Sequence, residues 1–317
     1  MMAQFVQEFK ATIKSPDTEE KLDLILYRPL GFVIAKLANV LSMNPTQLSL
    51  LGLFSGWAGA YYFLQREMAG AWLLGSMFYI LSGIFDSSDG QLARLANKST
   101  KLGLVLDGIC DSFVTIAIYL AASWPYFQEF GPWYFFVMFP ALFMHSSQCA
   151  ILDFYHREYL YFGYVKIESD TYWNPGVAEA ISHVSEASDK KDRLLSKLRI
   201  SWIKQQQFLS TRSESERLKW KRFLSSATPE QRQEFGALYR KANLKLLPFW
   251  RLLGPNFHTF LIITFLYLGR FDLYMYLFDY LLLNLVIVVM GRVQKKSDAK
   301  FIQSISHLLA TSREQSV

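Results

Sequence analysis

Long apolar blocks constrain the possible folds of this chain more than any other sequence feature. A helix needs about 20 consecutive apolar residues to cross the roughly 30 Å hydrocarbon layer of a membrane. Six blocks of about this length occur, each rich in Leu, Phe, Tyr, Ala and Gly. They lie at residues 45–64, 70–94, 102–124, 131–153, 253–270 and 273–291. The pattern predicts an all-α, polytopic membrane protein with six transmembrane helices.

The composition excludes several other classes of protein. Charged residues make up 19% of the chain, against about 25% in an average soluble domain, so we expect neither disorder nor a nucleic-acid partner. The two cysteines, Cys110 and Cys149, lie inside apolar blocks without metal-type spacing, which excludes a disulfide framework and a cysteine-based zinc site. The N-terminus lacks a basic region followed by an apolar core, so we expect no cleavable signal peptide.

The distribution of basic residues predicts the orientation in the membrane. With the N-terminus placed inside, the inner segments hold 31 Lys and Arg residues, and the outer connections hold only Arg66 and Arg270. Long loops count for little in this rule. Leaving out residues 154–252 still gives 13 basic residues inside against 2 outside. We therefore expect a multi-pass protein with both termini on the cytoplasmic side.

The N-terminal region allows two interpretations. Residues 25–44 are apolar but are interrupted by Arg28, Pro29 and Lys36, which disfavours another membrane span. One interpretation is a helix that lies along the membrane surface. The other is a short helix that packs on the bundle.

Residues 154–252 form a predicted cytoplasmic insertion with 18 basic and 11 acidic residues. Thr228-Pro229-Glu230-Gln231 is typical of a helix start, with Thr as the cap and Pro at the first position. The insertion is either a basic amphipathic helix on anionic lipid or, slightly favoured, a small helical subdomain with its own core. The apolar stripe behind both interpretations consists of Leu194, Leu195, Leu198, Trp202 and Leu209.

These features divide the chain into five segments. They are an N-terminal segment (1–44), helices one to four (45–153), the insertion (154–252), helices five and six (253–291) and a cytoplasmic tail (292–317).

Four carboxylates lie at the inner ends of the second and third spans. Asp86 and Asp89 are three residues apart, and Asp107 and Asp111 are four apart, so each pair shares one face of its helix. The connection between the spans is short, which makes the helices antiparallel neighbours. We therefore expect the four side chains to converge near the cytoplasmic surface. Intramembrane carboxylates are costly and mark functional sites by default.

Four converging carboxylates repel one another unless they are protonated or neutralised. Oxygen ligands without a nearby His or Cys suit Mg²⁺, Mn²⁺ or Ca²⁺. Two such ions could clamp a phosphate group between an attacking and a leaving oxygen. Gly90 would let a ligand approach the backbone, and Arg94 can pair with phosphate through two hydrogen bonds. Structural ion pairs with Arg94, Lys98 and Lys101 are the alternative explanation of these carboxylates.

The spacing of these residues resembles the complete signature of the CDP-alcohol phosphotransferases, also called CDP-alcohol phosphatidyltransferases. The segment reads Asp86-Ser-Ser-Asp89-Gly90-Gln-Leu-Ala93-Arg94, then eight residues, Gly103, three residues, Asp107, three residues and Asp111. No position departs from the signature. The core similar to the family covers about residues 40–291, and neither the insertion nor the N-terminal extension belongs to it.

The resemblance implies a six-helix membrane enzyme that is often a homodimer. Such an enzyme moves a phosphoalcohol group from a CDP-alcohol to an acceptor hydroxyl and releases CMP. It also implies that the metal ligands for Mg²⁺ or Mn²⁺ are Asp86, Asp89, Asp107 and Asp111, and that Asp111 is the base. The implied contacts of the CDP-alcohol are Gly90, Arg94, Thr100, Ser49 and Gly52. Ala93 and Gly103 are fixed positions of the motif.

The signature does not identify the substrates. The donor is either CDP-diacylglycerol with a polar acceptor, or a CDP-linked head group with a lipid or polyol acceptor. A polar patch of the fourth span could line the acceptor pocket, or its serines could bond to their own helix. The patch contains His145, Ser146, Ser147, Gln148 and Asp153, followed by His156, Arg157 and Glu158.

Two non-enzymatic functions compete with this interpretation. A divalent-cation transporter could use the carboxylates as a filter, but the outer halves of the second and third spans are almost wholly apolar, and Gly90 and Arg94 would have no role. A membrane scaffold is the other alternative, and the intact signature argues against it.

Overall fold

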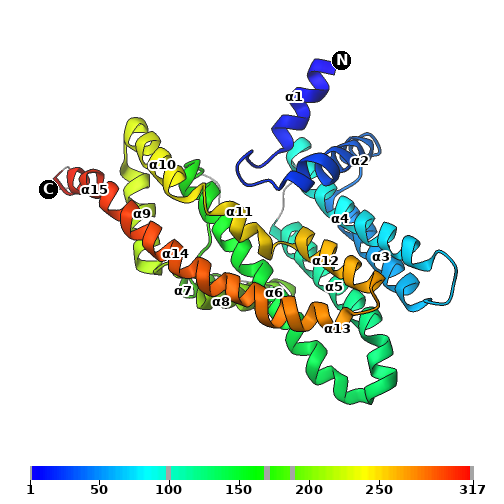
Figure 1. The fold of residues 1–317 in the computed structure, drawn as a ribbon. Coiled ribbons are helices and arrows are strands. Elements are labelled where there is room, and N and C mark those ends of the chain that lie inside the picture. The colour runs from blue at the N-terminus through cyan, green and yellow to red at the C-terminus, as the bar shows by residue number, and fades with distance from the viewer. Residues whose placement is uncertain (1, 98–100, 168–171, 186–189, 315–317) are drawn as a thin grey trace. The chain divides into compact units, whose positions relative to one another are not determined.

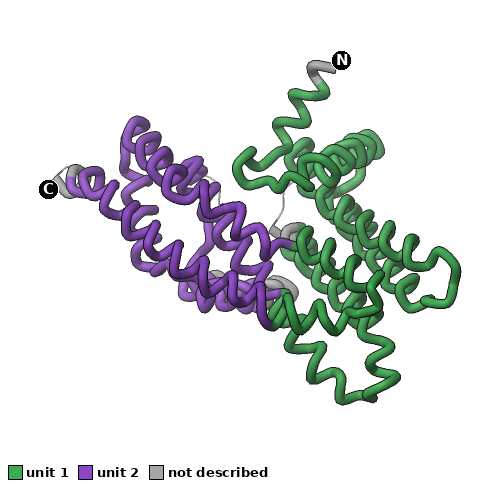
Figure 2. Tube along the Cα trace, viewed as in Figure 1, with its two compact units in different colours: residues 1–145, 255–280 green, residues 146–254, 281–317 purple. Residues whose placement is uncertain are grey.

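The computed structural model describes residues 2–97, 101–167, 172–185 and 190–314, and every regular element among them is helical. The all-α prediction is therefore confirmed for the described part of the chain. Figure 1 shows the order of the helices along the chain, and Figure 2 colours its two compact units. Unit 1 comprises Met1–His145 and Pro255–Tyr280, and unit 2 comprises Ser146–Gly254 and Leu281–Val317.

Unit 1 begins with the N-terminal helices α1 (Met2–Thr12), η1 (Asp23–Tyr27) and α2 (Arg28–Val40). One face of α2 is buried, including Phe32 and Ala35, and Ala35 packs in a cluster with Leu92 of α4. The second part of the N-terminal region thus packs on the helix bundle. The outer face of α2 remains apolar and exposed, and its position at a membrane surface stays a prediction.

Three closely packed helices form the centre of unit 1: α3 (Pro45–Leu64), α4 (Ala71–Leu95) and α5 (Lys101–Phe130). Glycines allow this close approach. A Cβ on Gly56 would lie 2.5 Å from Cγ1 of Val114, and one on Gly59 would lie 3.0 Å from the carbonyl oxygen of Gly75. The close packing brings the end of α4 and the start of α5 to the same level of the bundle.

The remaining elements of unit 1 are η2 (Gly131–Tyr134), the first part of α6 (Phe135–Glu158), α12 (Pro255–Tyr267), α13 (Phe271–Tyr274) and most of η5 (Met275–Leu282). They enclose a buried polar cluster. Tyr119 donates a 2.6 Å hydrogen bond to Asp279 and lies 3.0 Å from Nδ1 of His145. Nδ1 of His258 lies 2.7 Å from the hydroxyl of Tyr274. These hydrogen bonds join polar side chains of α5, α6, α12, α13 and η5 inside an otherwise apolar bundle.

Two continuous helical stretches of the described residues are long and apolar enough to cross a membrane, namely Val105–Gly163 and Phe271–Ser304. This agrees with a membrane protein, whereas the six spans expected from the sequence stay a prediction. The fifth expected span is longer than the helix that the structure has in this region. Only 13 residues of 253–270 form helix α12, which corresponds to about 20 Å of helix and falls short of the hydrocarbon layer.

Unit 2 contains the end of α6 followed by η3 (Tyr159–Gly163), α7 (Val177–Ser185), α8 (Lys190–Leu209), α9 (Glu214–Ser226), α10 (Pro229–Asn243), α11 (Leu247–Trp250), η4 (Arg251–Leu253), α14 (Leu283–Ser304) and α15 (Ser306–Glu314). Its core is largely aromatic. The core includes Tyr159, Tyr161, Phe162, Trp173, Trp220, Phe223, Phe235, Tyr239 and Phe301.

The insertion therefore has a core, but not the one that the apolar stripe suggested. Leu194 is 59% exposed, whereas Ile203 and Gln206 of the same helix are buried. The prediction is thus wrong for Leu194. The predicted start of α10 is confirmed, because Thr228 and Gln231 form reciprocal capping hydrogen bonds.

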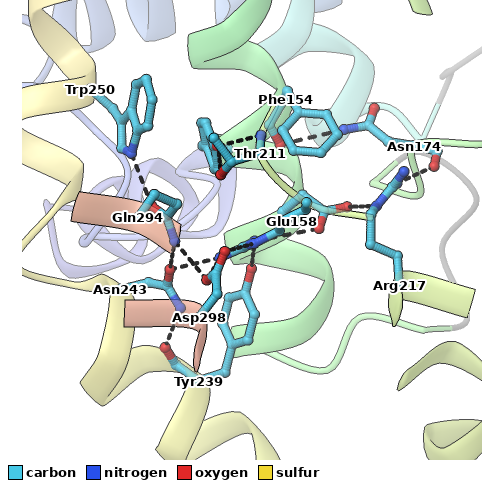
Figure 3. A network of polar contacts seen from close by, with 12 residues as sticks. Phe154, Glu158, Asn174, Thr211, Arg217, Tyr239, Asn243, Trp250, Gln294 and Asp298 are labelled. Carbon is cyan, nitrogen blue, oxygen red and sulfur yellow. Dashed lines mark hydrogen bonds and ion pairs between the residues drawn. The ribbon is translucent and has the colours of Figure 1, made fainter. Parts of the chain in front are cut away.

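A buried network of charged residues holds several elements of unit 2 together (Figure 3). Arg212 pairs with Asp298 of α14 at 2.8 Å and with Glu158 of α6 at 3.4 Å. Arg217 of α9 pairs with Glu158 at 2.8 Å. Burial acts to lower the pKa of Arg212, but Asp298, Tyr239 and Glu158 raise it well above its usual value, so this side chain stays charged. We call Arg212, Arg217, Glu158 and Asp298 the arginine network.

Candidate active site

Three of the four signature carboxylates meet between α4 and α5, two helices that both pack on α3. Asp86 and Asp89 come from α4, and Asp107 comes from α5. One oxygen from each lies within 4.8 Å of the other two. Asp107 is within hydrogen-bonding reach of both Asp86 and Asp89. The convergence expected from the sequence spacing for all four carboxylates is therefore present for three of them.

Asp111 lies one helical turn further along α5 and is exposed. It stands outside the group of three, but its carboxylate interacts electrostatically with Asp86, Asp107 and Asp89. Asp86 is also exposed, whereas Asp89 is buried. We call the four residues the carboxylate cluster. Its accessible side lies at Asp86 and Asp111, and its inner side lies at Asp89.

Ser49 and Gly52 of α3 contact the signature helix α4 directly. The hydroxyl of Ser49 donates a hydrogen bond to the Asp89 carboxylate. A Cβ on Gly52 would lie 3.3 Å from the carbonyl oxygen of Ser82, whose hydroxyl donates a 2.8 Å hydrogen bond to the Gly52 carbonyl. Ser49 thus orients a carboxylate, and Gly52 serves helix packing. Contact of either residue with a nucleotide stays a prediction.

Gly90 and Arg94 lie together on α4. A Cβ on Gly90 would lie 3.4 Å from Nη1 of Arg94, an ordinary van der Waals distance. Packing within the described chain therefore does not require glycine at this position, and the guanidinium of Arg94 lies directly beside it. Nε of Arg94 donates a 2.7 Å hydrogen bond to the Thr12 carbonyl, which holds the guanidinium in place.

The remaining motif positions add little to the site. Ala93 is half-buried on α4, and Gly103 is half-buried on α5. Thr100, expected near the nucleotide phosphates, lies outside the described residues.

The N-terminal segment contributes two cations to this site that no sequence pattern predicted. Arg28 pairs with Glu19 at 2.8 Å and donates a 3.3 Å hydrogen bond to the hydroxyl of Ser87, the residue after Asp86. The charges of Arg28 and Lys14 both act on Asp86. No local motif marks these two cations, because only the folding of residues 12–28 against α4 brings them near the carboxylates.

The polar patch proposed for the acceptor is largely engaged in contacts within the protein. His145 belongs to the buried cluster of unit 1. In unit 2, Ser147 accepts a hydrogen bond from Gln205, and Asp153 pairs with Arg157. Glu158 belongs to the arginine network. These partners weaken the expectation that the patch forms an acceptor pocket.

The donor set of the carboxylate cluster fits hard divalent cations. Its ligands are oxygens only, and they are crowded closely enough to repel one another when ionised. Asp86, Asp89 and Asp107 would hold such an ion, with Asp111 within electrostatic reach of it.

Comparison with known proteins supports the signature. Residues 42–153 match the CDP-alcohol phosphatidyltransferase family, and this match covers 112 of the 317 residues. The family assignment made from the signature is therefore confirmed for this segment, which contains α3, α4, α5 and most of α6.

Two curated proteins are similar to parts of the chain. The "Bifunctional IPC transferase and DIPP synthase" of Aquifex aeolicus (strain VF5) is 31% identical over 114 residues, which are 33% of this chain and 24% of that protein. The human "CDP-diacylglycerol--inositol 3-phosphatidyltransferase" is 40% identical over 55 residues, which are 17% of this chain and 26% of that protein. The chain thus matches about a quarter of the length of each relative. No solved structure gives a significant match.

Proposed function

We propose that this chain is a membrane phosphotransferase of phospholipid biosynthesis. It moves a phosphatidyl or phosphoalcohol group from a CDP-alcohol to an acceptor hydroxyl and releases CMP. The observation that carries this proposal is the convergence of Asp86, Asp89 and Asp107 within the family signature. Four carboxylates without a ligand repel one another and destabilise the folded protein, whereas cations bound together with a phosphate substrate would neutralise them.

The side chains have distinct roles in the proposed reaction. Arg94, held by the Thr12 carbonyl and lying beside Gly90, binds the CDP phosphates through its planar fork. Asp111 accepts the proton of the acceptor hydroxyl as that oxygen attacks phosphorus. A carboxylate is a sufficient base when proton transfer is late. The carboxylate cluster would hold two Mg²⁺ or Mn²⁺ ions, whose positive charge would neutralise the transferring phosphate and the departing CMP.

In this proposal, the protein is a multi-pass membrane protein with a cytoplasmic active site. The basic residues of the inner segments support this orientation. The close glycine packing of α3 and α4 supports their assignment as membrane helices, because small residues allow such contacts in lipid. A homodimer and membrane lipids are the partners that family similarity suggests.

Measurement of CMP release tests the proposal. The purified chain is incubated with CDP-diacylglycerol, CDP-choline or CDP-ethanolamine, each with Mg²⁺ or Mn²⁺ and with a panel of alcohols that includes inositol. CDP-diacylglycerol is the first donor to test, because the name of the human relative contains it. We expect metal-dependent CMP release from one donor class, and loss of that release in Asp86→Asn. Cation flux through reconstituted vesicles without CMP release would instead support the transporter alternative.

A further inference from the structure

Unit 2 contains an open cavity that the proposed reaction does not use. Its volume is about 380 Å³. It lies beside the residues that follow η3 and the first turns of α10. Its lining consists of Tyr164, Val165, Pro229, Arg232, Gln233 and Arg240.

Arg232 is fixed in the wall of this cavity by neutral partners. Its Nε donates a 2.9 Å hydrogen bond to the carbonyl of Leu224, and its Nη2 donates a 3.3 Å hydrogen bond to the carbonyl of Ser225. Both acceptors belong to the last turn of α9. These bonds use two of the five N–H donors of the guanidinium. The side chain is thus positioned while part of its hydrogen-bonding capacity remains.

Arg240, two turns further along α10, is held in a similar way. Its Nη1 donates a hydrogen bond to the Gly163 carbonyl, and its guanidinium lies 5.3 Å from the ring centre of Tyr164. The wall behind it is tightly packed, because a Cβ on Gly236 would lie 2.8 Å from the Gly163 oxygen. The two arginines therefore belong to a preformed site and not to a mobile surface.

Neither guanidinium is neutralised by a carboxylate of the described residues. The acidic residues at the start of α10 have other partners. The backbone N–H of Glu230 and the side chain of Thr228 lower the pKa of the Glu230 carboxyl, and Glu234 lies 2.9 Å from His307. Two fixed positive charges thus line one cavity without a balancing negative charge.

We propose that this cavity binds a phosphate group, carried either by an anionic phospholipid headgroup or by a soluble phosphate ester. The planar fork of arginine matches phosphate oxygens, and two guanidinium charges suit an anion that carries up to two negative charges. The Tyr164 hydroxyl and the Gln233 amide supply neutral polar groups at the same cavity. The proposal does not depend on the reaction proposed above.

Phosphate titration of the full chain tests this site. The protein is placed in nanodiscs of neutral phosphatidylcholine. A chelator removes divalent cations, so that phosphate cannot bind through metal at the carboxylate cluster. Inorganic phosphate is then titrated calorimetrically at constant ionic strength. We expect saturable binding that weakens about tenfold in Arg232→Gln, because each charge-assisted hydrogen bond contributes about that factor. Arg240→Gln should weaken binding similarly. Arg232→Lys should also bind more weakly, since it keeps the charge but loses the fork.

Arg222→Gln is the matched control, because Arg222 is an exposed arginine of α9 and its loss changes the net charge equally. Its affinity for phosphate should equal that of the wild type. Absence of saturable binding by the wild type would overturn the proposal. Equal affinity in the wild type and in a well-folded Arg232→Lys or Arg232→Gln protein would also overturn it.

A second set of nanodiscs distinguishes the two sources of phosphate. Phosphatidylglycerol is added at an ionic strength that screens the surface potential. If a lipid headgroup occupies the cavity, phosphate affinity of the wild type falls to the level of Arg232→Gln. Unchanged affinity assigns the site to a soluble phosphate ester.

Discussion

The carboxylate cluster of unit 1 and the arginine network of unit 2 are both groups of charged side chains, but their charges are arranged in opposite ways. In the network, Arg212 and Arg217 face Glu158 and Asp298, so that positive and negative charges balance. In the cluster, three carboxylates lie within 4.8 Å of one another, and Arg28 beside them already pairs with Glu19. The cluster is therefore left with excess negative charge.

This difference separates a structural role from a binding role. In a balanced buried network the positive and negative charges pair with one another, and the removal of one member leaves an unpaired charge in the interior. An unbalanced cluster lowers stability on its own and gains stability when a cation arrives. The same kind of substitution should therefore damage folding in unit 2 and turnover in unit 1.

The largest expected effect is loss of turnover in Asp86→Ala and Asp107→Ala. Each substitution removes a metal ligand, and we expect CMP release to fall by about 10³-fold or more, since metal ions supply several kcal/mol of transition-state stabilisation. The free energy of unfolding without metal should not decrease, because one repulsive charge is gone. Steady-state CMP release and thermal unfolding check both parts. Asp272→Asn, which removes a carboxylate paired with Arg270 outside the cluster, serves as the control and should keep wild-type turnover.

Arg212→Met should lower the stability of the folded protein, in contrast to the loss of turnover expected in the carboxylate cluster. Its side chain is only 1% exposed and pairs with Glu158 and Asp298, so its loss should cost about 3–5 kcal/mol of unfolding free energy. Denaturant titration measures this loss. Arg222→Gln on the exposed surface should stay within about 0.5 kcal/mol of the wild type. A similar stability in Arg212→Met and Arg222→Gln would show that the network does not hold unit 2 together.

Asp111→Asn tests whether the outermost carboxylate acts as the base. The variant keeps the size of the side chain but cannot accept the proton, so we expect turnover to fall by about 10²-fold, with donor binding retained. The measurement is turnover across a Mn²⁺ titration. Recovery to near the wild-type rate at high Mn²⁺ would assign Asp111 to metal binding alone.

Arg94→Lys should have the smallest of these effects. A lysine keeps the positive charge but loses the planar fork and the Nε bond to the Thr12 carbonyl, so the affinity for the CDP-alcohol should fall about tenfold. Equilibrium binding of the donor, with metal binding as the control, checks this. An unchanged donor affinity would remove Arg94 from the nucleotide site.

The carboxylate cluster could be predicted because it depends on the spacing of residues within two helices that follow each other in the chain. Spacings of three and four residues fix the faces of α4 and α5, and the short connection keeps the end of one helix near the start of the other. The partners of these carboxylates depend on distant residues and could not be predicted in the same way. Ser49 reaches Asp89 from α3, and Lys14 approaches Asp86 from the N-terminal segment.

The arginine network and the buried cluster of unit 1 show the limit of sequence patterns more clearly. Tyr119 and Asp279 are 160 residues apart, and Arg212 and Asp298 are 86 apart. No periodicity connects such pairs. The apolar stripe of α8 was wrong for Leu194 for a related reason, because a helical wheel identifies a face but not the surface that covers it. Gln206 is buried there because it donates hydrogen bonds to the Ala150 carbonyl and Asp153.

The most direct test of the contrast between the two regions is thermal unfolding of the full chain during a Mn²⁺ titration, without substrate. The unbalanced cluster should bind the ion only in the folded state, so the wild type should gain about 2.7 kcal/mol of stability at a Mn²⁺ concentration 100 times the dissociation constant. Asp89→Asn should lose most of this gain, and Asp272→Asn should keep it. No stabilisation of the wild type by Mn²⁺ or Mg²⁺, or equal stabilisation of Asp89→Asn, would contradict a metal site at the carboxylate cluster.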